Sequence, residues 1–332
     1  MPRILVTPTL VQHVDCSCRR VLEAANFEIV YLTVPESRLT VAADMIGQLE
    51  GIDGVVAGAD PYTREVLKAS RLKAIARVGV GYDAIDMATA NELGIAVTIT
   101  PGTNEHSVAE LTIALMMGVY RGFPGRDQEV RAGAWKRKPL RRLQGRTMGL
   151  IGLGRIGRAV AWRAQGLGLK VIAFDPFADP EYAGSQNIDL VGFEELLVQS
   201  DIVSLHVPCT PETTDLMNAR AFSLMRQGAV LINTARGGLV DEDALAAALA
   251  SGHLAGAGLD VFKIEPLPLE SPLLKVDNVL LAPHMGGLDE DSLDAMTRMA
   301  AECLANLFTG KWPEGCVVNE HLRSTWTANG QK

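Results

Sequence analysis

The stretch TMGLIGLGRIGRAVA, residues 147–161, limits the possible folds of this chain more than any other feature. Gly152, Gly154 and Gly157 form a G-x-G-x-x-G pattern between an apolar run and a helical pattern. Such glycines permit a tight turn and let a pyrophosphate approach the positive end of the following helix. Asp175 closes the next apolar run, KVIAFD, at 175 − 157 = 18 residues beyond the third glycine. An acid about 20 residues on is typical of ribose recognition, so we predict a dinucleotide site rather than an ordinary glycine-rich turn.

The residues around Asp175 also indicate which dinucleotide binds. A carboxylate accepts hydrogen bonds from ribose hydroxyls and repels a 2'-phosphate. Pro176 and Phe177 provide no cation that could receive such a phosphate. We therefore predict NAD rather than NADP as the cofactor.

Short β-rich runs alternate with helical patterns along the chain, which is typical of parallel sheets. The first set is RILVTPT, FEIVYL, GIDGVVAG, LKAIARVG and IAVTIT. The second set is TMGLIGLG, KVIAFD, DIVSLHVP, AVLINTA, GAGLDVF and NVLLAPH. The pattern predicts an α/β fold with two doubly wound parallel-sheet domains, a Rossmann NAD-binding domain inserted into a flavodoxin-like substrate domain.

Two breaks in the chain suggest where these domains meet. Pro101 and Gly102 precede SVAELTIALMMGVY, a pattern apolar on nearly all sides, for which Ser107 and Glu110 would form a capping box. The second break is the pair Gly286 and Gly287, followed by a last helical pattern, EDSLDAMTRMAAECLANLF.

If that last helix returns to the first unit, two crossings join the domains and form a hinge. We predict a discontinuous substrate-binding domain, 1–100 plus 287–332, and an NAD-binding domain, 101–286.

Charge and cysteine usage exclude several classes of function. With 31 Lys plus Arg against 39 Asp plus Glu, the net charge of −8 disfavours nucleic acid as a partner. The basic run WKRKPLRR, residues 135–142, is interpreted as a solvated surface arm. The five cysteines form no CxxC pair, so we expect no metal site, no disulfide framework and a reducing cytoplasm. No signal peptide or membrane-spanning run is expected either.

Polar residues follow three late apolar runs. Arg236 lies in NTARGGLVDEDAL, where the two glycines would let substrate or cofactor approach the backbone. Asp260 and Glu265 lie in DVFKIEPLP, and His284 lies in LLAPHMGG. Alone, such a histidine is more often structural. Because ligands bind at the carboxyl ends of parallel strands, we expect these segments to converge on one crevice.

The motifs described above resemble those of the D-isomer-specific 2-hydroxyacid dehydrogenases, and the resemblance covers essentially the whole chain. Within that family it is similar to the branch of phosphoglycerate dehydrogenases and hydroxypyruvate or glyoxylate reductases. The resemblance rests on ARVGVGYDAID, TPGTNEHSVAEL, GLIGLGRIGRAVA, SLHVPCTPETTDL, INTARGGLVDEDAL, GAGLDVFKIEPLP and APHMGG.

The resemblance implies roles for individual residues. The catalytic residues would be Arg236, Glu265 and His284. The NAD site would comprise Gly152, Gly154, Arg155, Ile156, Gly157, Asp175, His206, Pro208, Thr213, Ala235, Asp260 and Gly286. Substrate would contact Arg77, Val78, Gly79, Gly81 and Asn104, together with Arg236 and His284. Trp135 could reach a neighbouring subunit, as in a homodimer, and His206 would position backbone rather than transfer protons.

The chemistry agrees with these roles. Hydride delivery to a 2-oxo acid builds negative charge on the carbonyl oxygen, which needs a cation and a proton. Arg236 can hold carboxylate and carbonyl oxygens through its planar fork. His284 would transfer the proton. Glu265 would orient the His284 ring and favour its charged imidazolium form.

The substrate is expected to be a small unphosphorylated 2-oxo acid, such as hydroxypyruvate or glyoxylate. In VVAGADPY, the residues from Ala57 to Ala59 provide no cation for a phosphate, Asp60 has the wrong charge, and Arg77 is the only cation obviously near. The alternative is D-3-phosphoglycerate, with a partner's arm, residues 136–142, supplying the charge. Leu288 stands where many phosphoglycerate-specific members have serine or threonine, and we expect no C-terminal regulatory domain of the kind that longer members carry.

Two further alternatives remain from the same fold. One is an oxidoreductase for phosphite or formate, and the other is an NAD(H)-binding corepressor that works as a dimeric scaffold. The complete set of Arg236, Glu265 and His284 and the lack of a nuclear-type basic cluster argue against the scaffold.

Overall fold

The computed structural model describes residues 1–137 and 139–327, and it divides into two compact units. Unit 1 is residues 1–104 together with the chain from residue 289, and unit 2 is residues 105–288. The boundaries that we expected, 100/101 and 286/287, fall slightly before these. Each unit is built around a parallel sheet, so the predicted α/β class with two parallel-sheet domains is confirmed.

Unit 1 contains a five-stranded parallel sheet in the order β2-β1-β3-β4-β5, the order of flavodoxin-like folds. Its strands are β1 (Arg3–Val6), β2 (Glu28–Tyr31), β3 (Gly54–Ala57), β4 (Ala74–Arg77) and β5 (Ala96–Thr98). Its α-helices are α1 (Ser17–Ala24), α2 (Ala42–Gln48), α3 (Arg64–Ala69), α4 (Met87–Leu93) and α12 (Glu290–Phe308). Short 3₁₀ helices span Thr9–Val11, Glu36–Thr40 and Glu320–Ser324.

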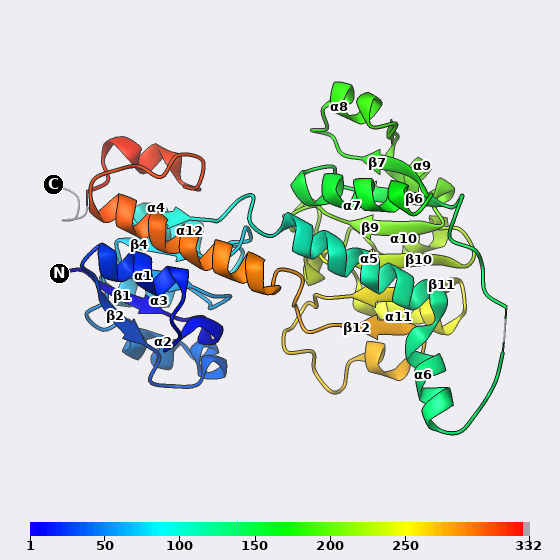
Figure 1. The fold of residues 1–332 in the computed structure, drawn as a ribbon, viewed down its shortest axis with the longest axis horizontal. Coiled ribbons are helices and arrows are strands. Elements are labelled where there is room, and N and C mark those ends of the chain that lie inside the picture. The colour runs from blue at the N-terminus through cyan, green and yellow to red at the C-terminus, as the bar shows by residue number, and fades with distance from the viewer. Residues whose placement is uncertain (138, 328–332) are drawn as a thin grey trace. The chain divides into compact units, whose positions relative to one another are not determined.

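The last long helix, α12, belongs to unit 1 as expected. It begins after Asp289, whose carboxylate accepts the N–H of Ser292 at 2.8 Å and so caps the helix. The helix packs against α1 and β4 (Figure 1). The chain therefore leaves unit 1 after residue 104 and returns to it at residue 289.

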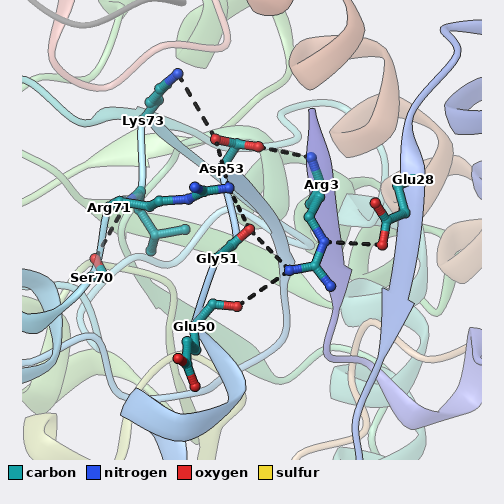
Figure 2. Close-up of polar contacts among 9 residues, drawn as sticks. Arg3, Glu28, Glu50, Gly51, Asp53, Ser70, Arg71 and Lys73 are labelled. Atoms are coloured by element: carbon teal, nitrogen blue, oxygen red, sulfur yellow. Dashed lines mark hydrogen bonds and ion pairs between the residues drawn. The ribbon is translucent and has the colours of Figure 1, made fainter. Parts of the chain in front are cut away.

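A cluster of charges ties together the amino ends of three neighbouring strands of unit 1. The Asp53 carboxylate accepts the backbone N–H of Arg3 at 2.9 Å and lies 3.5 Å from Arg71 and 3.8 Å from Lys73 (Figure 2). Arg3 starts β1, Asp53 and Lys73 immediately precede β3 and β4, and Arg71 lies two residues before Lys73. The carboxyl ends of the same strands, where ligands bind in such folds, lie at the opposite edge of the sheet.

Unit 2 contains a seven-stranded parallel sheet in the order β12-β11-β10-β9-β6-β7-β8, which is the Rossmann order counted from β6. Its strands are β6 (Thr147–Ile151), β7 (Lys170–Phe174), β8 (Asp189–Leu190), β9 (Ile202–Leu205), β10 (Ala229–Asn233), β11 (Leu254–Leu259) and β12 (Val279–Leu281). Its α-helices are α5 (Glu105–Arg121), α6 (Phe123–Arg131), α7 (Arg155–Gly166), α8 (Pro180–Ser185), α9 (Phe193–Gln199), α10 (Ala219–Leu224) and α11 (Glu242–Ala250). Short 3₁₀ helices span Gly237–Leu239 and Pro272–Lys275.

Helix α5 packs against α7, β10 and β11, as its apolar sequence predicts (Figure 1). The predicted capping box at its start is wrong. The helix begins at Glu105, so Ser107 is buried inside the first turn. Glu110 pairs instead with Arg163 of α7 at 2.9 Å. Within the described part of the chain, no helix has both the length and the apolar character needed to cross a bilayer.

Candidate active site

The glycine-rich turn joins β6 to α7, and the space around the Cα atom differs among its three glycines. Gly152 has φ +101°, and a Cβ there would lie 2.5 Å from the carbonyl oxygen of His206. A Cβ on Gly157 would lie 2.2 Å from the carbonyl oxygen of Gly152. Nothing lies within 4 Å of the position that a Cβ on Gly154 would take. The outer two glycines are therefore required by packing, and the middle one leaves the turn open towards a ligand.

Asp175 follows β7, and its carboxylate is fixed beside this turn. Its Oδ2 accepts the N–H of Leu153 and its Oδ1 accepts the N–H of Phe177, both at 2.8 Å. Each oxygen retains a second lone pair that can accept a ribose hydroxyl. The two bonds orient the carboxylate beside the glycine turn.

His206 follows β9 and is held beside the glycine turn. Its N–H donates to the carbonyl of Ile151 at 2.7 Å, and its Nε2 lies 2.9 Å from the hydroxyl of Ser204. Burial of the ring lowers the pKa of His206 to about 3, so the ring is neutral. A neutral, buried ring is unsuited to donating a proton, whereas the His206 backbone lies directly against Gly152.

The loop after His206 is closed by Thr213. Its hydroxyl donates to the carbonyl of Pro208 and accepts the N–H of Thr210, both at 2.8 Å. Pro208 and Thr213, both predicted to line the cofactor, are therefore joined directly.

Arg236 lies in a turn directly after β10. Asn233, the last residue of that strand, holds the turn through hydrogen bonds to Ala235 and Arg236. For Gly237, the first of the two following glycines, the predicted role needs correction. A Cβ on Gly237 would lie 1.9 Å from the carbonyl carbon of Phe262, so this glycine admits the protein's own backbone rather than a ligand.

The side chains of His284 and Glu265 are in direct contact. His284 Nδ1 lies 2.7 Å from Glu265 Oε2, and the two side chains are 41% and 35% exposed. The other carboxylate oxygen, Oε1, accepts the N–H of Phe262 at 2.9 Å. Burial would raise the pKa of Glu265, but the His284 contact, the Phe262 N–H and the charge of Arg236 together hold it below the ordinary value. Glu265 is therefore an anion that faces the histidine.

Asp260, which follows β11, fixes the loop that carries His284. Its carboxylate accepts the N–H groups of Met285 and Gly286 at 2.8 and 2.9 Å, and its carbonyl accepts the N–H of His284 at 2.8 Å. Burial raises the pKa of Asp260, although the two N–H bonds act in the opposite direction. His284 has φ +52°, an uncommon conformation for a residue other than glycine.

These groups gather at one edge of one sheet. The strands β10, β11 and β12 are neighbours, and their carboxyl ends lead to Arg236, Glu265 and His284. The strands β6 and β7, in the same parallel sheet, lead to the glycine turn and Asp175. The predicted convergence is therefore observed within unit 2. Arg155 and Ile156 begin α7 at this edge, and Ala235 lies beside Arg236.

The substrate residues predicted in unit 1 lie at the carboxyl end of β4 and beyond. The N–H of Val78 donates to Ala57, and the N–H of Gly79 donates to the hydroxyl of Thr100. Gly79 has φ +128°, and a Cβ there would lie 3.1 Å from the Arg77 guanidinium. Gly81 and Asn104 are partly exposed.

Asp60, predicted to carry the wrong charge for a phosphate, is buried in unit 1. It accepts hydrogen bonds from the hydroxyl of Thr7 and from the N–H of Gly58. Burial raises its pKa. Among the residues with defined positions, no group of three or more His, Cys, Asp or Glu side chains could hold a metal ion.

Comparison with known proteins agrees with this geometry. The family model described as "D-isomer specific 2-hydroxyacid dehydrogenase, NAD binding domain" matches residues 113–286. The chain is similar to a glyoxylate reductase of Korarchaeum cryptofilum, with 41% identity over 271 residues, 80% of this chain and 82% of that protein.

The chain is also similar to a D-3-phosphoglycerate dehydrogenase of Methanocaldococcus jannaschii, with 41% identity over 267 residues. That match covers 79% of this chain but 51% of the relative, so the chain spans about half of the relative's length. Among solved structures, the TT0316 protein from Thermus thermophilus matches with a TM-score of 0.84 and 37% identity, covering 95% of this chain and 100% of that one.

Proposed function

The chain belongs to the D-isomer specific 2-hydroxyacid dehydrogenase family, and from that premise we propose that it interconverts a small D-2-hydroxy acid and its 2-oxo acid. The observation that carries the proposal is the 2.7 Å contact between His284 and Glu265, with Arg236 at the same sheet edge as the glycine turn. NAD, when bound, supplies or accepts the hydride.

His284 is proposed as the acid that protonates the substrate oxygen during reduction. The contact of Nδ1 with the Glu265 carboxylate fixes a proton on that nitrogen and leaves Nε2 for the substrate. The anionic carboxylate stabilises the imidazolium before proton transfer. In the oxidative direction, the neutral ring accepts the proton.

Arg236 is proposed to bind the carboxylate and the carbonyl oxygen of the substrate. A planar guanidinium can hold two oxygens at once and stabilise the negative charge that develops as the hydride arrives. Its electrostatic effect on Glu265 supports its placement in the same site.

We infer that the cofactor is bound by the glycine turn and Asp175, together with the loop from His206 to Thr213 and the residues Ala235, Asp260 and Gly286. Two observations support this fit. The turn is open at Gly154, and Asp175 is oriented by two backbone N–H groups with lone pairs to spare.

The substrate is proposed to be unphosphorylated, of the hydroxypyruvate or glyoxylate type. The loop after β3 supports this, because Ala57 to Asp60 contribute no cation to pair with a phosphate. D-3-phosphoglycerate is the second candidate, favoured by Arg77 at the end of β4 and by the basic arm, of which Lys138 lies outside the described residues.

We further propose that the protein forms a homodimer in the cytoplasm. Helix α6 and the following arm expose four large apolar side chains, those of Phe123, Val130, Trp135 and Leu140. A cavity of about 430 Å³ lies beside them, with Leu140 in its wall. The cytoplasm is proposed from the sequence, whose five cysteines are odd in number and form no CxxC pair.

The reaction can be tested by following NADH and NADPH oxidation with a panel of 2-oxo acids, and NAD reduction with formate and phosphite. We expect turnover with NADH and small 2-oxo acids, and a clear preference for NADH over NADPH. Turnover with formate or phosphite alone would support those alternative reactions instead. NADH binding without turnover of any compound would support the scaffold.

A further inference from the structure

Asn233 is a buried amide directly beneath the turn that carries Arg236. It ends β10 and is 1% exposed. Its Oδ1 accepts the N–H of Ala235 at 3.0 Å, and its Nδ2 donates to the carbonyl of Arg236 at 2.8 Å. The amide therefore spans the turn and binds the Thr234–Ala235 and Arg236–Gly237 peptide groups, which lie before and after the Ala235–Arg236 peptide.

The backbone of the same residue leads to the histidine. The carbonyl of Asn233 accepts the N–H of Asp260 at 2.9 Å, and the carbonyl of Asp260 accepts the N–H of His284 at 2.8 Å. Asn233 thus connects to Arg236 through its side chain and to His284 through its main chain. A side-chain substitution acts on the first connection and retains the atoms of the second.

We propose that Asn233 is a positioning residue whose side-chain amide sets the direction in which Arg236 projects. This inference rests on the proposed role of Arg236. Arg236 has extended backbone dihedrals, φ −145° and ψ 140°, and the next residue, Gly237, is pressed against Phe262. The turn is thus held by two contacts: Gly237 packs against the Phe262 backbone, and the Asn233 amide binds Ala235 and Arg236.

Asparagine is the side chain that satisfies both partners. Aspartate would keep the acceptor for Ala235 but would direct an oxygen at the Arg236 carbonyl, which cannot donate a hydrogen bond, and would bury a charge. Serine can accept the Ala235 N–H in a similar turn but is too short to reach the Arg236 carbonyl as well. Both variants therefore lose the bond to Arg236 while keeping the one to Ala235.

The test measures hydroxypyruvate kinetics, inhibition by oxalate and NADH affinity in Asn233→Ser and Asn233→Asp. Asn233→Ser introduces no charge into the core, so it carries the test if Asn233→Asp does not fold. Asn278→Asp is the matched control. Asn278 Nδ2 also donates to two carbonyls, those of Leu249 and Ala255, at 3.4 Å. Asn278 immediately precedes β12, so it lies at the amino ends of the strands, away from the candidate site.

We expect both Asn233 variants to lower kcat/KM for hydroxypyruvate by about 10- to 100-fold, the usual effect of a small misplacement of a binding group. KM and the inhibition constant of oxalate should rise together. NADH affinity and the midpoints of the pH profile should be those of the wild type. The Asn278 variant should match the wild type in all of these measurements.

A double-mutant cycle with Arg236→Lys separates this inference from the proposed function. If Asn233 acts through Arg236, adding Asn233→Ser to Arg236→Lys causes little further loss. An additive loss, or a parallel fall in NADH affinity, would overturn the positioning role. Unchanged kinetics in Arg236→Lys alone would instead overturn the proposed function of the arginine.

Discussion

At the residue scale, the backbone of His284 is held in an uncommon conformation by the contacts that Asp260 makes. A non-glycine residue at φ +52° costs free energy, and such strain clusters at functional sites. Three hydrogen bonds to Asp260, from His284, Met285 and Gly286, maintain it. In this conformation the ring contacts the Glu265 carboxylate at 2.7 Å.

The first prediction concerns the ring of His284 itself. Asparagine tolerates the left-handed conformation better than alanine does, so His284→Asn removes the acid with less disturbance of the loop. We expect turnover to fall by roughly 10²- to 10⁴-fold, the usual contribution of general acid–base catalysis. NADH affinity, measured by fluorescence titration, should change little. Near-normal turnover would exclude His284 as the proton donor.

The second prediction concerns pH. Because the pKa of Glu265 is held below its ordinary value, Glu265 remains an anion across the neutral range and stabilises the imidazolium. Reduction requires that imidazolium. In Glu265→Gln the counter-charge is absent, so the loss of kcat/KM for reduction as pH rises should begin at a lower pH than in the wild type. A profile that does not move would show that Glu265 does not act on the proton donor.

At the scale of elements, the turn after β10 and the loop after β11 are packed as one body. A Cβ on Gly237 would lie 1.9 Å from the Phe262 carbonyl carbon, and the N–H of Phe262 binds Glu265. The next residue, Lys263, is held by Glu242 and Asp215. Displacing one segment must therefore move the other.

The third prediction uses this contact. Gly237→Ala should lower both the melting temperature and turnover, because the added methyl group displaces the backbone that orients Glu265. Gly47→Ala is the matched control. Gly47 lies within α2 with nothing within 4 Å of the added atom, so we expect stabilisation of roughly 0.5–1 kcal/mol there, from helix propensity, and unchanged kinetics. A fully active Gly237→Ala protein would contradict this coupling.

Strand positions could be predicted from the sequence because buried parallel strands read as short apolar runs. The ends of elements and their close contacts were harder to predict. An S-x-x-E pattern does not show whether a helix has already begun upstream, so the start of α5 was misplaced. The close contact of Gly237 cannot be predicted from the sequence pattern, because its neighbour, Phe262, is distant in sequence. Asn233 was missed, although an asparagine closing an apolar strand three residues before an arginine was a usable signal.

At the scale of the whole molecule, the order of the motifs identified the family, and the alternation of runs identified the two sheets. The glycine turn, Asp175 and the polar ends of three strands all lie in unit 2, where we propose the site. The substrate is harder to predict from the sequence. Apolar patterns do not show which charged residues are buried, and Asp60, which is charged in the sequence, is buried in the fold.

The fourth prediction concerns assembly. We expect the protein to sediment as a dimer, and Val130→Glu on α6 to shift it towards monomer by placing a charge in the proposed interface. Val198→Glu on α9 is the matched control, since the two valines are 55% and 54% exposed. It should leave the dimer intact. A dimer that tolerates both substitutions would place the interface elsewhere.

The central claim, that this site reduces a small unphosphorylated 2-oxo acid, is tested most directly by kcat/KM for hydroxypyruvate and 3-phosphohydroxypyruvate with NADH on the same preparation. A phosphate without paired cations forgoes charge-assisted hydrogen bonds worth about 1.5–3 kcal/mol each, or roughly ten- to a hundredfold in affinity. We predict that kcat/KM for hydroxypyruvate exceeds that for 3-phosphohydroxypyruvate by at least roughly tenfold. A preference for the phosphorylated acid would contradict the account and indicate that cations outside the β3 loop bind the phosphate.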